Sequence, residues 1–342
     1  MRNYHYKLRG LLLFAFTLAL AATATRPVRE AAALQALLPY PSQDSVILHP
    51  YDPGDASGKL LLLMRPFYAS LSGRDFTIQS RPGRGGASAW NHIGSMDDNA
   101  SMSDDGYALT LTDLPNLALL SQRTHPAFDI NELRNACLLA SMPLMLWTPA
   151  DSKLADLYDL VGRARENPGQ IVLAGLGVGT VQHLANLRLD RLAGIKTTFI
   201  SYSGDSSARQ AALDGKALAF WGHSDPALAL ALTAEGRRAC RPLAVAATQR
   251  HPLFPETPTF AELGYDLIEI SHFGLAISAK TNAKTSQSVS AAWLNLARNQ
   301  DFQKAIERAG FTPAPVGAFE LSTYLNSLLA YYAEQRADYN LQ

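Results

Sequence analysis

Short apolar runs alternate along this chain with longer stretches in which an apolar residue recurs at every third or fourth position. The short runs are typical of buried strands, and the longer stretches are typical of amphipathic helices. One longer apolar run, Leu138–Trp147, predicts one strand or two. Strands that alternate with helices predict an α/β fold, in which helices cover a mixed or parallel sheet. The other predicted strands are 45–49, 76–79, 107–111, 171–176, 197–200, 217–221, 243–247 and 273–277, and the predicted helices are 59–71, 90–96, 154–165, 181–192, 208–213, 227–235 and much of 286–339.

The most informative junction is Gly175–Thr180, where an apolar run ends in three spaced glycines and a helical pattern begins. Glycine permits positive φ and close approach of the backbone to a ligand, and Thr180 is a suitable N-cap. First-turn N–H groups lack intrahelical partners and the helix dipole is positive there, so this junction can bind an anion through its backbone. An ordinary strand-to-helix turn has the same pattern. The G-x-G-x-G spacing and the absence of a following Gly-Lys-Ser/Thr argue against a nucleotide.

The N-terminus has the pattern of an export signal. Basic residues precede an apolar core at 11–22, and Ala22-Thr23-Ala24 provides the small residues of a cleavage site. A membrane anchor is the alternative, but the core is shorter than the ~20 residues that a spanning helix needs. We therefore predict that 1–24 is a cleaved signal peptide and that the protein is periplasmic.

Composition limits the architecture and the partners. At 342 residues the chain is long enough for two domains with buried cores. The 30 basic and 30 acidic residues balance, and no cluster of Lys and Arg marks a surface for nucleic acid. The two cysteines, Cys137 and Cys240, either pair in an oxidising compartment or remain buried thiols.

Four loops that follow predicted strands are rich in Gly, Ser, Thr or Asp. In open α/β sheets, ligands bind in the crevice beyond the carboxyl ends of the strands. These loops are therefore the candidate ligand loops: 50–58, 112–116, 175–183 and 202–207.

Six motifs in these and neighbouring segments follow one another in a distinctive order. They are Pro50-Tyr51-Asp52-Pro53-Gly54, Arg81–Gly86, Asp105-Gly106-Tyr107-Ala108-Leu109, Gly175–His183, Tyr202-Ser203-Gly204 and Thr257–Gly264. In this order and spacing they resemble the Bug family, the solute receptors of tripartite tricarboxylate transporters. The resemblance covers nearly the whole chain after the predicted signal peptide.

The resemblance implies a type 2 periplasmic binding protein fold, with two α/β lobes that crossover strands connect and a ligand cleft between them. Lobe one is expected at 25–136 plus 248–342, and lobe two at 137–247. The helical tail is expected to pack on lobe one. Both cysteines would then lie near the crossovers, which leaves their pairing open.

The function that the resemblance implies is capture of a small carboxylate, an organic acid or an amino-acid-like molecule, for delivery to membrane permease subunits. Hinge closure would complete the site. A monomer without catalytic residues, metal or cofactor is expected. The ligand-binding residues expected on this basis are Tyr51, Gly54, Asp55, Thr112, Asp113, Gly177, Gly179, Thr180, His183, Tyr202 and Gly204.

Several positions depart from the family pattern. Asp55 replaces the second loop glycine, Gly58 replaces an aspartate, Asp113 stands where relatives carry Ser, Thr or Gly, and Leu176 replaces a serine. A buried carboxylate that faces a ligand carboxylate is costly unless it is paired. The pattern therefore favours a ligand with a cationic or hydrogen-bond-donating group as well as an acid. The alternative is that Asp52, Asp55 and Asp113 point to solvent or cap helices.

Other conspicuous side chains have ordinary explanations. His183 suits a ligand contact and helix packing equally, whereas Trp221 and His223 are expected in the core or near a crossover. No G-x-S-x-G or H-E-x-x-H motif supports the remote alternative of a secreted hydrolase. A further alternative is a periplasmic sensor, whose closed form would signal to a membrane protein instead of supplying a permease.

Overall fold

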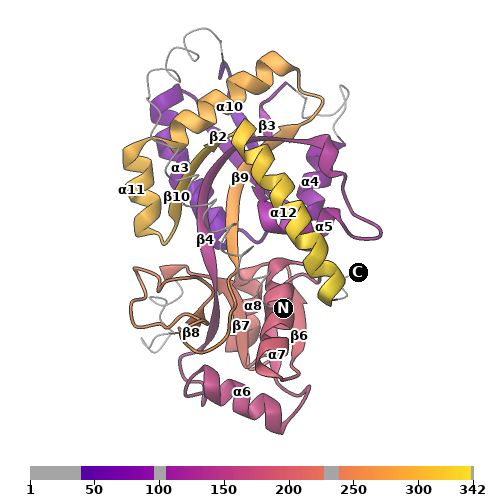
Figure 1. Ribbon diagram of the computed structural model, residues 1–342. Helices are drawn as coiled ribbons and strands as arrows, with labels where there is room; N and C mark the ends of the chain where they lie inside the picture. Colours follow the sequence, from indigo (N-terminus) through magenta and orange to yellow (C-terminus); the bar gives the residue numbers. More distant parts are fainter. Residues whose placement is uncertain (1–39, 96–104, 227–238, 340–342) are drawn as a thin grey trace.

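The computed structural model describes residues 40–95, 105–226 and 239–339 (Figure 1). The predicted signal peptide, 1–24, and the predicted helix 227–235 lie outside the described residues, as does Met96, the last residue of another predicted helix. Within the described ranges, no helix combines the length and the apolar character needed to cross a membrane.

Strands and helices alternate along most of the chain, as the sequence predicts. The strands are β1 (Ser45–His49), β2 (Phe76–Ser80), β3 (Ala108–Asp113), β4 (Leu133–Pro149), β5 (Val172–Leu176), β6 (Thr198–Tyr202), β7 (Ala219–His223), β8 (Cys240–Val245), β9 (Ile270–Ser278) and β10 (Thr312–Gly317). The α-helices are α3 (Ala56–Ser72), α4 (Ala87–Gly94), α5 (Leu114–Ser121), α6 (Leu157–Glu166), α7 (Val181–Ala193), α8 (Asp205–Leu213), α10 (Ala283–Ala297), α11 (Gln300–Arg308) and α12 (Ala318–Tyr339).

The strands form two sheet regions that share β4 (Figure 1). In the first region β1 pairs in parallel with β2 and β3, and β9 lies antiparallel between β3 and β4. In the second region β5 pairs in parallel with β6 and β7, while β4 pairs antiparallel with β7 and β8. Helices lie beside each region, so the described residues form two α/β lobes.

The pairing of β4 changes along its length. Residues 133–143 pair with β9, whereas 144–149 pair with β7 and β8. A second connection, from β8 to β9, runs beside this point, where the N–H of Leu144 donates to the carbonyl of Glu269. Below, lobe one means the described residues up to 143 and from 270 onward, and lobe two means those between. The lobe boundaries expected from the sequence, between 136 and 137 and between 247 and 248, stay a prediction.

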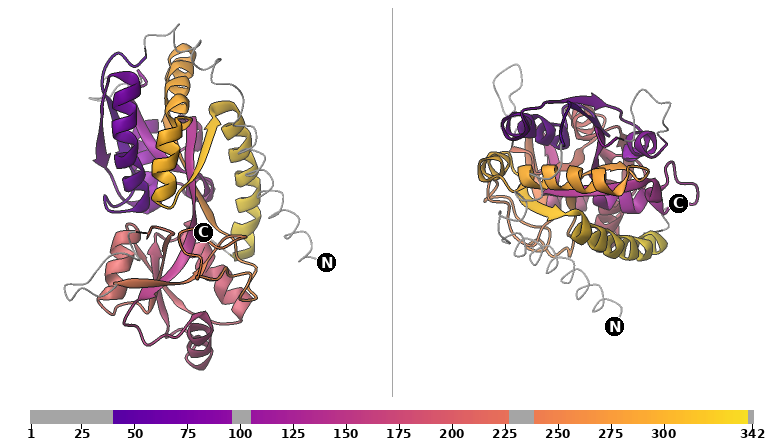
Figure 2. Two further views of the ribbon diagram at one scale, coloured as in Figure 1. Left: turned by 90° about the vertical axis from the view of Figure 1, so that its left-hand side faces the viewer. Right: turned by 90° about the horizontal axis from the view of Figure 1, so that it is seen from above.

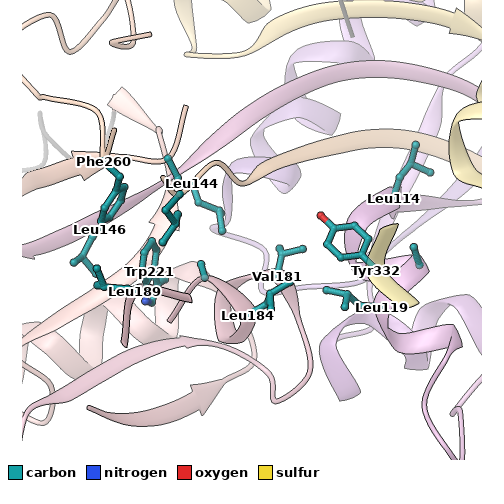
Figure 3. Close-up of a cluster of buried hydrophobic side chains, with 14 of the residues drawn as sticks. Leu114, Leu119, Leu144, Leu146, Val181, Leu184, Leu189, Trp221, Phe260 and Tyr332 are labelled. Atoms are coloured by element: carbon teal, nitrogen blue, oxygen red, sulfur yellow. The ribbon is translucent and has the colours of Figure 1, made fainter. Parts of the chain in front are cut away.

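Each lobe has buried apolar residues, and one apolar cluster continues across both lobes. Figure 3 shows Leu119 of α5 and Tyr332 of α12 beside Val181 and Leu184 of α7. α12 runs along the side of lobe one toward lobe two (Figure 1 and Figure 2). Burial of apolar area contributes roughly 25 cal/mol per Å², so this cluster favours contact between the lobes.

The structure differs from the predicted elements at 112–116 and in the C-terminal region, and it resolves one alternative that the sequence leaves open. The predicted loop at 112–116 is instead the end of β3 followed at once by the first turn of α5. The long apolar run is a single strand, β4, of 17 residues. The chiefly helical region also contains β10, whose two prolines obscure a strand pattern in the sequence. Cys137 in β4 and Cys240 in β8 are both buried and free.

Candidate functional site

The loop after β1 carries Asp55 to a contact with lobe two. Asp55 directly precedes α3 and is only 4% exposed. Its Oδ1 accepts hydrogen bonds from the backbone N–H and the hydroxyl of Ser206, at 2.9 and 2.7 Å. Ser206 is the second residue of α8, and the N-cap of α8 is Gly204, which has no side chain for the first-turn N–H groups. Asp55 therefore supplies, from the other lobe, the capping carboxylate that α8 lacks.

Two more polar contacts join the lobes beside Asp55. The hydroxyl of Ser203 donates to Asp52 at 3.1 Å. Lys59, in the first turns of α3, forms an ion pair with Asp225, which follows β7. The first two turns of α3 and the loop before them thus contact lobe two at three side chains.

The glycine loop before α7 has its backbone donors engaged within the protein. The N–H of Gly177 donates to the carbonyl of Tyr202 at 3.1 Å, and that of Gly179 donates to Nδ1 of His183 at 3.2 Å. The N–H of Thr180 reaches the carbonyl of Gly177 at 3.4 Å. In this arrangement of the lobes, the three amides satisfy acceptors of lobe two itself.

The N-terminus of α7 is capped from lobe one. Thr180 is the N-cap residue, as predicted, but its hydroxyl donates to the carbonyls of Leu176 and Gly177 and makes no capping bond. Instead, the N–H of Val181 donates to Oδ1 of Asn116 at 2.8 Å. α7 and α8 therefore both begin at a side chain that lobe one provides.

A chain of buried hydrogen bonds leads from Asn116 toward the crossover. The amide Nδ2 of Asn116 donates to Oδ2 of Asp113 at 2.7 Å and lies 3.2 Å from the hydroxyl oxygen of Tyr51. The hydroxyl of Ser271, in β9, donates to the same Asp113 oxygen at 2.9 Å. Tyr51, Asn116 and Asp113 are each at most 3% exposed, so this network is removed from water.

The chain continues into lobe two through His223. Nε2 of His223 lies 2.9 Å from Oγ of Ser271, and Nδ1 lies 2.6 Å from Oδ2 of Asp205. The one hydroxyl proton of Ser271 is donated to Asp113, so Nε2 must donate to Ser271. Nδ1 faces a carboxylate oxygen and donates as well. Both ring nitrogens then carry protons, and His223 is an imidazolium paired with Asp205.

The pKa values of the buried groups agree with this assignment. Burial opposes charge on His223, but Asp205 outweighs burial and raises the pKa of His223 to about 9. Burial, with the nearby charge of Asp205, raises the pKa of Asp55 to about 7. Burial raises the pKa of Asp113 to about 6, although His223 opposes the rise. The lobe contact therefore contains carboxyl groups that ionise close to neutral pH.

Comparison with known proteins identifies the family of this chain. A family model described as "Tripartite tricarboxylate transporter family receptor" matches residues 70–330. The chain belongs to this family. The family consists of binding receptors, and its members are periplasmic binding proteins. The resemblance to the Bug family that the six motifs indicate is confirmed.

Two relatives illustrate the sequence similarity of this receptor. It is 28% identical over 262 residues to "UPF0065 protein in tcbD-tcbE intergenic region" of Pseudomonas sp. (strain P51), over 74% of this chain and 71% of that protein. It is 26% identical over 229 residues to "Protein BugT" of Bordetella pertussis, over 66% of this chain and 67% of that protein.

Solved structures show that the receptor has the fold of periplasmic binding proteins. Against the periplasmic binding protein BugD, the TM-score is 0.79 at 17% identity, covering 89% of this chain and 99% of that one. MatC of Rhodopseudomonas palustris, with bound malate, gives 0.73 at 20% identity over 86% and 99%. A protein of R. palustris with adipate gives 0.77 at 18% identity over 88% and 99%. The predicted α/β fold of two lobes is confirmed.

The receptor's structure brings several predicted ligand residues together. Gly54 and Gly204 lie on the two sides of the contact between Asp55 and Ser206, and a Cβ on Gly54 would be 3.5 Å from Oγ of Ser206. Gly177 closely approaches Gly85 of lobe one, because a Cβ there would be 3.3 Å from the Cα of Gly85. The remaining loop glycine, Gly179, has φ of 82°, which explains why the turn before α7 uses a glycine there.

The side chains of three other predicted residues pack within their own lobe. Thr112 is fully buried in β3, and its hydroxyl has no hydrogen-bond partner among the described residues. His183 packs against Phe199 with ring centroids 4.8 Å apart, and Tyr202 packs partly buried against a lobe-two core cluster. That these and the other predicted residues bind ligand stays a prediction.

The alternative that the loop acids point to solvent or cap helices is wrong for Asp113, whereas Asp55 does cap a helix, α8 of the other lobe. Asp55 and Asp113 are buried, and although each stands at the N-cap position of a helix, neither makes a capping bond to that helix. Trp221 is a core residue, as expected, stacked on Phe260 with ring centroids 5.6 Å apart. His223 lies near the crossover, also as expected, and the sequence gives no sign of its charge.

Sequence reasoning missed residues that organise the lobe contact. Ser206 and Asp205 stand just after Gly204, and a helix that begins without a capping side chain is a signal that a cap must come from elsewhere. Asn116 lies within a predicted ligand loop and was not singled out there. Ser271 has no sequence signal, because only the pairing of the lobes places it between Asp113 and His223.

Proposed function

We propose that this receptor captures a small carboxylate in the periplasm, between its two lobes, and presents it to membrane permease subunits of a tripartite tricarboxylate transporter. Family membership and the fold shared with proteins solved with malate and adipate support this function. The proposal includes a cleaved signal peptide at 1–24 and action as a monomer.

The observation that carries the proposal is the set of contacts between loops of the two lobes. Asp55 meets the first turn of α8, and Asn116 meets the first turn of α7. Both helix N-termini follow strands of lobe two, where open α/β sheets bind ligands and where backbone N–H groups attract anions. A carboxylate held there would be contacted from both lobes at once.

Binding would work by shifting an equilibrium between closed and open lobes. The lobes are connected through β4 and through the second connection beside Leu144 and Glu269, so these segments are the natural hinge. Glu269 accepts from Arg188 of α7 at 2.5 Å and from the hydroxyl of Tyr332 of α12 at 3.3 Å. A ligand that touches both lobes favours the closed state by its differential affinity for that state.

The test is a thermal-shift and calorimetric screen of the mature chain with small organic acids and amino acids, including malate and adipate. A ligand present at 100 times its dissociation constant adds about 2.7 kcal/mol to the free energy of unfolding. We expect at least one carboxylate to raise the melting temperature and its methyl ester to have no effect. If no carboxylate binds, the proposed function is wrong.

A further inference from the structure

Asp55 is a carboxylate that occupies an anion-binding position of its own protein. Ser206 gives Asp55 both a helix N–H and a hydroxyl, the two donors that a ligand carboxylate would use at this helix end. The carboxylate fills the position closely, because a Cβ on Gly204 would lie 2.2 Å from Oδ2 of Asp55. A ligand carboxylate cannot share these donors with Asp55.

The surrounding charges make a second anion at this place unfavourable. Burial is the main cause of the raised pKa of Asp55, and the charges of Asp205 and Asp52 raise it further. The nearest cation of the buried network, His223, is already paired with Asp205. Lys59, on the following turn of α3, is paired with Asp225. A ligand carboxylate next to Asp55 would therefore meet like charge, while His223 and Lys59 already have carboxylate partners.

We propose that Asp55 is a specificity-determining residue that takes the place of one ligand carboxylate, so that the receptor selects molecules with one carboxylate and a cationic or hydrogen-bond-donating far end and rejects dicarboxylates. This inference rests on the proposed function and narrows its ligand class. The inference differs from a simple effect of negative charge in the site. It requires Asp55 itself to accept the hydrogen bonds at the first turn of α8.

The experiment compares adipate with its ω-amino analogue of similar length, in which an ammonium group replaces one carboxylate. A shorter pair, succinate and its ω-amino analogue, is titrated in parallel, because the length that fits is set by the site. Calorimetric titrations use the mature wild-type chain and the variants Asp55→Ala, Asp55→Asn and Asp52→Ala. Asp55→Ala frees the donors of Ser206, whereas Asp55→Asn keeps an acceptor on Ser206 and removes only the charge. Asp52→Ala removes a neighbouring charge without releasing a helix N–H.

We expect the wild type to bind an ω-amino acid at least about ten-fold more tightly than the dicarboxylate of similar length. Asp55→Ala is expected to reverse this preference, Asp55→Asn to weaken it, and Asp52→Ala to change it least. Circular dichroism of each variant verifies that it is folded, and Asp55→Asn preserves the test if Asp55→Ala is unstable.

Three outcomes overturn the inference, and the last of them is distinguishable because it also overturns the proposed function. If the wild type binds dicarboxylates as tightly as ω-amino acids, or if Asp55→Ala and Asp52→Ala shift the preference equally, Asp55 does not set specificity, while the receptor function stands. If neither the wild type nor any variant binds a carboxylate in the wider screen, the proposed function fails and the inference fails with it.

Discussion

The two helices of lobe two that begin at the contact with lobe one, α7 and α8, receive chemically different caps. Asn116 gives α7 a neutral amide oxygen, whereas Asp55 gives α8 a carboxylate. Both caps are buried, and both accept one backbone N–H at 2.8 to 2.9 Å. The contacts between the lobes therefore include two similar hydrogen bonds to helix N-termini, and only one of these two caps is an ionisable side chain.

The difference teaches how one contact can respond to protons while its neighbour does not. Asp55 and Asp113 both have raised pKa values, and the paired His223 carries the positive charge that the region needs. The cap on α7 uses no charge of its own. We expect the contact at α7 to be independent of pH. The contact at α8 should become stronger or weaker as Asp55 loses or gains a proton.

The largest effect is expected from breaking the ion pair behind the α8 cap. Asp205→Ala leaves the imidazolium of His223 buried without its partner, which costs on the order of 3–5 kcal/mol of unfolding free energy. Urea unfolding measures this loss. The matched control, Asp214→Ala, removes the partner of an exposed pair with Lys216 and is expected to leave stability unchanged. Equal losses in the two variants would contradict the charged state assigned to His223.

The neutral cap is expected to contribute less. Asn116→Ala removes the acceptor for the N–H of Val181 and a donor to Asp113, and it leaves both groups buried. A loss of about 2 kcal/mol is expected from such unsatisfied groups. Asn131→Ala, at an exposed asparagine, is the control and should unfold like the wild type. A loss no larger than that of the control would show that water replaces Asn116 at no cost.

The charged cap should make stability depend on pH. The pKa of Asp55 is raised from 3.8 to about 7, so between these pH values the folded protein holds a proton that the unfolded chain releases. The group therefore disfavours the folded state increasingly as pH rises from about 4 to about 7. Asp55→Asn should match the wild type in stability near pH 4 and become progressively more stable than the wild type as the pH rises to about 7, because the variant has no charge to bury. Melting temperatures across this range measure the difference, and parallel curves would refute it.

The smallest effect concerns the apolar side of the same contact. Tyr332→Phe keeps the ring beside Val181 and removes only the hydroxyl that donates to Glu269 at 3.3 Å. The expected loss is about 1 kcal/mol or less, because the hydrogen bond is long and the ring remains. Tyr332→Ala, which also removes the ring, should lose about 3 kcal/mol or more. Similar losses would mean that the hydroxyl, not the ring, holds α12 to the hinge.

The fold was predictable because its signals are local. The run before Gly175 ends as a strand, and a helix follows Thr180, because apolar spacing and turn residues act over a few positions. The order of the six motifs indicated the family, and the family resemblance in turn predicted the two lobes. The single strand β4 was harder, since a run buried on both faces has no period that separates one strand from two.

The site was predictable as a set of loops but not as a set of bonds. The amide of Val181 meets a side chain 65 residues away, and Asp55 meets one 151 residues away. Nothing local indicates that the donors of the glycine loop are already engaged. The direction of a side chain at a lobe contact depends on which partner the other lobe presents, and a single sequence does not contain that information at either position.

Gly204 has extended backbone angles that any residue can adopt, with φ of 178°, so its glycine is not required for conformation. A methyl group at 204 would nevertheless collide with the carboxylate of Asp55. A side chain at position 204 would therefore push Asp55 away from Ser206 and release the two donors at the start of α8.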